Sequence, residues 1–96
     1  MAFDPDAPHR LSPRVGLRPE PFGALAYHYD TRRLVFLKAV ALVELVRALE
    51  QHPSARAAVD ALVDEPARRP AFLTALASLA ESGVVEPLHA TLRETA

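Results

Sequence analysis

Residues 23–54 read GALAYHYDTRRLVFLKAVALVELVRALEQHPS, and two different periodicities meet in this stretch. Residues 22–29 and 33–37 are rich in strand-forming side chains, and a polar break at 30–32 separates them. This pattern predicts an antiparallel hairpin. After Lys38 the apolar residues recur every three or four positions, which predicts a helix with one apolar face. The residues of that face are Leu42, Leu45, Val46 and Leu49.

Prolines and capping residues mark the elements on either side of this stretch. Residues 14–18 alternate like a strand, and the two prolines that follow are expected to end it. Ser54 is suited to cap a second helix, and a third helix is expected over 70–82. Residues 84–85 form one more short strand. The fold class is therefore predicted as α+β, a three-stranded antiparallel meander followed by three helices, close to a winged helix-turn-helix.

The proline distribution also divides the chain. Five of its nine prolines lie within the first 21 residues, so residues 1–13 are expected to form a flexible or extended arm. Residues 14–87 form the folded domain, and residues 88–96 a C-terminal tail. Ninety-six residues provide one modest hydrophobic core.

Composition excludes several classes of function. The chain has no cysteine, so it carries no disulfide, thiolate zinc site or iron–sulfur cluster, and a reducing, cytoplasmic compartment is expected. Phosphate-binding glycine motifs are absent, and the four histidines show no metal-ligand spacing. Cofactors, metals and catalysis are therefore not expected. The longest uncharged run, residues 70–80, is too short to span a membrane, and residues 1–13 lack the apolar core of a signal peptide.

Nucleic-acid binding fits the element order but not the charge. The net charge is −1, and the predicted third helix carries Glu81 and no basic residue. Residues 1–38 are mildly basic and residues 39–96 acidic, which reflects either ordinary surface variation or two binding faces of opposite sign. A winged-helix DNA-binding protein remains the alternative, and a gel shift at physiological salt would detect it.

Recognition of an extended peptide is the class of function that the sequence still favours. Residues 33–37 are apolar on both faces and form the end strand of the predicted meander, so one row of backbone groups has no partner. Beside the apolar third helix, this edge would make a groove for a peptide strand. The same residues could instead fill a small core, or the edge could pair with a second copy as a homodimer. A proline at Val35 would block the edge if the Val35 N–H points outward; otherwise Leu34 or Phe36 is the residue to replace.

Two stretches carry a resemblance to a known family. YHYDTRRLVFLK, residues 27–38, and FLTALASLAESGVV, residues 72–85, resemble the mycofactocin biosynthesis chaperones. These are similar to the pyrroloquinoline-quinone peptide chaperones and to precursor-peptide recognition elements. The turn at residues 30–33 lacks the glycine usual in the quinone branch, which favours the mycofactocin branch.

The resemblance implies a non-catalytic peptide chaperone. In the wider family a precursor peptide's leader adds as a strand to the third strand, against the third helix, and a radical S-adenosylmethionine maturase receives the peptide. Residues 14–87 would then be a peptide-recognition domain. Phe72, Leu76 and Leu79 are expected to offer apolar pockets, and arginines at 32, 33 and 69 to attract acidic leader residues. The full predicted peptide-binding set is Arg33, Leu34, Val35, Phe36, Leu37, Arg69, Phe72, Leu73, Leu76 and Leu79.

Overall fold

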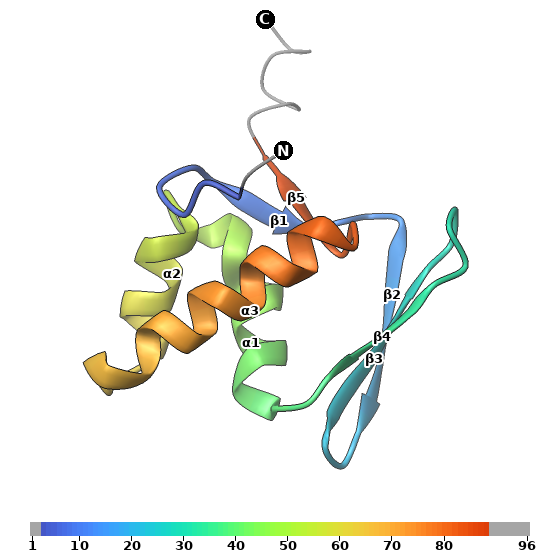
Figure 1. Ribbon diagram of the computed structural model, residues 1–96, viewed down its shortest axis with the longest axis horizontal. Helices are drawn as coiled ribbons and strands as arrows, with labels where there is room; N and C mark the ends of the chain where they lie inside the picture. Colours follow the sequence, from blue (N-terminus) through green and yellow to red (C-terminus); the bar gives the residue numbers. More distant parts are fainter. Residues whose placement is uncertain (1–2, 89–96) are drawn as a thin grey trace, which may run out of the picture.

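A helical layer and a projecting three-stranded sheet make up the computed structural model, which describes residues 3–88 (Figure 1). The predicted α+β order is confirmed, with a small two-stranded sheet in addition. Within the described residues, no helix has both the length and the apolar character that a bilayer crossing requires. The elements are β1 (His9–Leu11), β2 (Val15–Glu20), β3 (Gly23–His28), β4 (Leu34–Leu37), α1 (Val40–Ala48), a 3₁₀ turn (Leu49–Gln51), α2 (Ala55–Leu62), a second 3₁₀ turn (Pro66–Arg68), α3 (Arg69–Glu81) and β5 (Val85–Pro87).

The segment predicted as an arm contributes to the helical layer. Its strand β1 pairs antiparallel with β5, so that Leu11 lies opposite Val85. Backbone carbonyls of Pro5 and Ala7 also accept hydrogen bonds from the first two residues of α2, at 2.8 and 3.1 Å. Proline carbonyls remain good acceptors, so a proline-rich segment can dock in extended form. The pairing joins segments far apart in the chain and leaves no local signal. Of the tail expected at 88–96, only Leu88 lies within the described residues.

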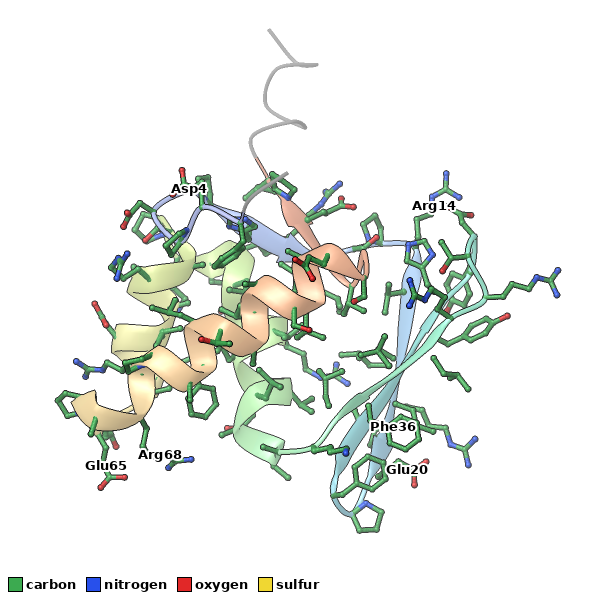
Figure 2. The ribbon with its side chains drawn as sticks, viewed as in Figure 1. Asp4, Arg14, Glu20, Phe36, Glu65 and Arg68 are labelled. Atoms are coloured by element: carbon green, nitrogen blue, oxygen red, sulfur yellow. The ribbon has the colours of Figure 1, made fainter. Side chains whose placement is uncertain are left out.

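The main sheet has the strand order β2-β3-β4, and Phe36 of β4 lies on its side away from the helices (Figure 2). The expectation that Pro19 ends the first of these strands is wrong, because β2 continues to Glu20. The Tyr29 N–H donates to the Arg14 carbonyl at 2.8 Å, and alternate residues of β2 face β3 from there on. The Pro19 nitrogen therefore faces the open side of β2, where a missing N–H breaks no ladder bond.

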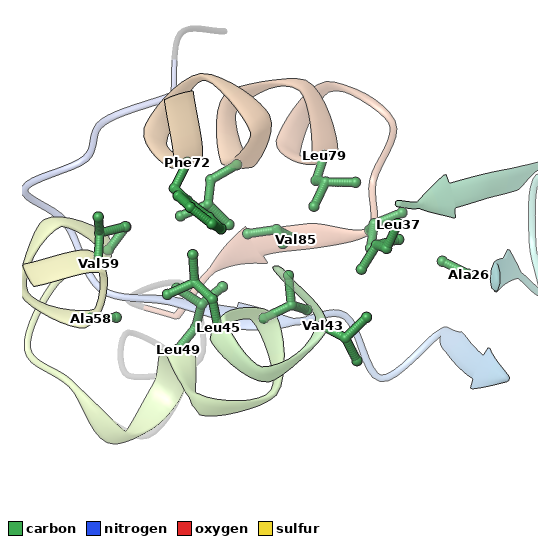
Figure 3. Close-up of a cluster of buried hydrophobic side chains, with 14 of the residues drawn as sticks. Ala26, Leu37, Val43, Leu45, Leu49, Ala58, Val59, Phe72, Leu79 and Val85 are labelled. Atoms are coloured by element: carbon green, nitrogen blue, oxygen red, sulfur yellow. The ribbon is translucent and has the colours of Figure 1, made fainter. Parts of the chain in front are cut away.

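The core lies between the three helices and the inner side of the sheet (Figure 3). The stripe predicted on α1 buries Leu45 and Val46, and α2 buries Val59. Leu37, at the end of β4, is fully buried and links the sheet to the helical layer. Val85 of β5 is also buried here, so the short terminal strands complete the same core.

Ser54 caps α2 as predicted. Its hydroxyl accepts a hydrogen bond from the Ala57 N–H at 3.0 Å. We expect Ser54→Ala to lower the free energy of unfolding by about 1 kcal/mol in urea denaturation, because an N–H at the helix start loses its acceptor. Ser54→Asp, which keeps an acceptor, is the control. Equal stability of the alanine variant and the natural chain would contradict the assignment.

Candidate functional site

The open edge of β4 is defined by its hydrogen-bonding register. The His28 N–H donates to the Arg33 carbonyl at 3.0 Å, and β4 continues in register from there. Because backbone groups alternate along an antiparallel pair, Val35 and Leu37 point their N–H and C=O groups at β3. Leu34 and Phe36 point theirs outward. Val35 is therefore not the residue at which a proline would block the edge.

The side chains of β4 also divide into two sets. Those of Leu34 and Phe36 are 59% and 55% exposed, on the side of the sheet away from the helices. Val35 is half-buried against the core, and Leu37 is fully buried within it. Only two of the predicted strand residues thus present both backbone and side chain to a ligand.

Helix α3 uses most of its predicted pocket residues for the core. Leu76 and Leu79 are buried there, and Leu73 packs against them in part. Phe72 is also largely buried, but it forms one wall of a hollow of about 220 Å³ between α3 and the start of α1. The remaining wall residues are Lys38, Ala39, Leu42, Ala71 and Ala75. Small alanines on α3 leave this space open. The apolar hollow therefore lies over Ala71 and Ala75, beside the residues predicted to form the pockets.

Arg69 is engaged inside the protein. Its guanidinium donates to the Val63 carbonyl at 2.9 Å and to the Asp60 carbonyl at 3.2 Å, which ties the end of α2 to the start of α3. Arg68, which the sequence reasoning did not select, lies 5.4 Å from the centre of the Phe72 ring as a cation–π contact. Arg33 is exposed at the start of β4.

Among residues 3–88, the ionisable side chains with clearly shifted pKa values are an exposed pair, Arg56 and Asp6. Arg56 donates a hydrogen bond to Asp6 at 2.8 Å and holds the pKa of that carboxyl below its ordinary value. This pair is exposed and ties the N-terminal segment to α2. Among residues 3–88, no group of three histidine or acidic side chains is placed to hold a metal ion.

An open strand edge beside an apolar hollow is the arrangement of a small recognition module for extended peptides. Residues 8–86 match the model of the Peptide chaperone MftB family, and the chain belongs to that family. It is thus a peptide chaperone of mycofactocin biosynthesis, of a non-catalytic family, and the resemblance found from the sequence is confirmed.

Curated relatives agree with this assignment. The chain is 45% identical to the peptide chaperone MftB of Mycolicibacterium smegmatis over 87 residues, which cover 91% of this chain and 85% of the relative. It is 46% identical to the protein of the same name from Mycobacterium tuberculosis over 90 residues, covering 93% and 82%. No solved structure matches the chain.

Proposed function

We propose that the chain binds the leader of a ribosomally made precursor peptide as a strand added to β4. It then presents the peptide to a radical S-adenosylmethionine maturase. The observation that carries the proposal is the outward direction of the Leu34 and Phe36 backbone groups beside the apolar hollow. Residues 14–87 act as the peptide-recognition domain. The maturase comes from the family resemblance, and the absence of cysteine leaves the iron–sulfur chemistry to that partner.

Backbone pairing sets the register of the leader. Leu34 and Phe36 each offer one N–H and one C=O to an incoming strand. A hydrogen bond of this kind contributes about 0.5–1.5 kcal/mol net. This pairing is indifferent to side-chain identity, so it positions the peptide without selecting its sequence.

The hollow between α3 and the start of α1 selects the leader by its side chains. It begins at Lys38 and Ala39, directly after β4, so a strand that runs past Leu37 reaches it. Burying one leucine-sized side chain there contributes about 1.5–3 kcal/mol. An exposed rim charge such as Arg33 contributes about 0–1 kcal/mol. We therefore expect an apolar leader residue to be the main anchor, with acidic neighbours that orient it.

Filling the hollow tests this function. We expect Ala75→Phe to weaken leader binding at least tenfold in titration calorimetry, because the new ring occupies the space of the anchor. Thr74→Phe is the matched control, since Thr74 is exposed on the same helix and does not line the hollow. Its affinity should stay within twofold of the natural chain.

Two outcomes would contradict the proposal. One is a folded natural chain that gives no heat with the leader peptide. The other is equal leader affinity in the natural chain and a folded Ala75→Phe variant. Salt-sensitive binding of duplex DNA in a gel shift, without leader binding, would favour the DNA-binding alternative.

A further inference from the structure

The side of the β2–β3–β4 sheet away from the helices, here called the outer face, carries an exposed aromatic patch. The rings of Phe22 and Phe36 stack with their centres 5.8 Å apart. Tyr27 and Tyr29 meet edge to face at the same distance of 5.8 Å, and Tyr29 is 57% exposed. Leu34 lies between the two ring pairs in the register, opposite Tyr27. Aromatic side chains that remain this exposed are typical of an interaction surface.

This outer face is also concave. A hollow of about 420 Å³ lies over β2 and β3, with Leu25, Tyr27, Tyr29 and Arg18 among its walls. Gly16 contributes to it directly, because a Cβ at this position would overlap the Tyr29 hydroxyl. The glycine therefore lets the Tyr29 ring lie across β2 and form one wall.

A leader paired with β4 reaches only the β4 wall of this hollow, which is Leu34. Adjacent strands lie about 4.8 Å apart, so β2 is roughly 15 Å from a strand added beyond β4. Side chains of the leader can touch Leu34 and Phe36 at the edge, but not the walls over β2. The walls over β2 are therefore open to an occupant other than the strand that pairs with β4.

Charge indicates what kind of occupant fits. Residues 14–38 carry five basic and two acidic side chains. The two acids are already paired, Asp30 with Arg14 at 3.1 Å and Glu20 with Arg18 at 3.0 Å. Within residues 3–88, no carboxylate pairs with Arg32, which lies in the turn between β3 and β4. Two copies meeting through this face would bring like charges together, which disfavours a face-to-face dimer. A partner with an apolar centre and an acidic rim is complementary.

We infer that the outer face docks a folded partner protein of that description, and that this partner is the maturase. The inference rests on the proposed function. Leu34 and Phe36 belong both to the outer face and to the open edge, so a protein seated on the face also touches a peptide held at the edge. The chaperone thereby places the peptide and its modifying enzyme side by side, with Leu34 and Phe36 between them.

The test measures two affinities in each variant. Tyr29→Ser removes one wall of the hollow, and Arg18→Glu reverses a charge at a side chain that is 80% exposed. Both positions lie away from the β4 edge. We expect at least tenfold weaker binding to the purified mycofactocin maturase in titration calorimetry, and leader affinity within twofold of the natural chain. Arg47→Glu on α1 makes the same charge change on an exposed helical residue and should leave both affinities unchanged.

The outcomes separate this inference from the proposed function. Maturase binding within twofold of the natural chain in both variants would overturn the docking face while leader binding stands. Failure of the natural chain to bind the leader would overturn the proposed function instead. A natural chain that sediments as a dimer, and as a monomer after Tyr29→Ser, would show that a second copy occupies the face and would also overturn the inference.

Discussion

Leu34→Pro and Phe36→Pro are each expected to weaken leader binding at least tenfold while the hairpin stays folded. Proline removes the N–H that points to the open edge, and its ring obstructs the incoming strand. The bonds between β4 and β3 use Val35 and Leu37, so neither substitution removes a bond of the native ladder. Titration calorimetry with the leader peptide measures the loss, and circular dichroism verifies the fold.

Three variants serve as controls for this result. Leu34→Ala and Phe36→Ala keep the outward N–H and should retain most of the affinity that the proline variants lose. Val35→Pro removes an N–H that faces β3 and should destabilise the hairpin itself. Unchanged leader affinity in a folded Leu34→Pro or Phe36→Pro chain would exclude strand addition at β4.

Gly23→Ala is expected to cost at least about 2 kcal/mol of folding stability, among the larger effects of a single substitution. Gly23 opens β3 with a φ of +148°, which side-chain-bearing residues rarely adopt. A Cβ here would overlap the backbone carbonyl oxygen of Leu37, which cannot move without breaking the end of β4. The measurement is the free energy of unfolding in urea.

Gly16→Ala is the comparison for this variant. The added methyl group meets only the hydroxyl end of Tyr29, a flexible side chain that can swing aside. We therefore expect a smaller loss of stability than for Gly23→Ala. The two variants having equal stability would contradict the assigned role of Gly23.

Local patterns were sufficient to predict the main sheet and the helices. The polar break at residues 30–32 and the stripe that includes Leu45 and Leu49 are each visible within fewer than ten consecutive residues. The pairing of β1 with β5 could not be found in this way, because Leu11 and Val85 meet only after the whole domain folds. The expectation that Pro19 ends its strand was wrong for a related reason. Whether a proline ends a strand depends on whether its nitrogen faces the neighbouring strand.

The candidate site was located more accurately on the strand than on the helix. An end strand exposes alternate residues, so Leu34 and Phe36 lay within the predicted set. On α3 the apolar residues surround most of the helix, and periodicity alone does not show which of them face the core. Packing assigns Leu76 to the core and leaves Ala75 at the hollow. The useful signal was residue size, since small side chains on an apolar helix create space.

The position of Pro19 on β2 has a consequence for stoichiometry. The backbone groups of three β2 residues point away from β3, namely those of Val15, Leu17 and Pro19. The Val15 N–H already donates to the Ser12 carbonyl at 3.1 Å, and Pro19 has no N–H. The open edge of β2 is therefore poorly suited to pair with another strand, whereas both outward residues of β4 keep their N–H groups. Under the proposed binding mode the sheet can grow on one side only, so each chain takes up a single peptide. The β4 of one chain also finds no suitable β2 on a second chain, which disfavours head-to-tail polymers.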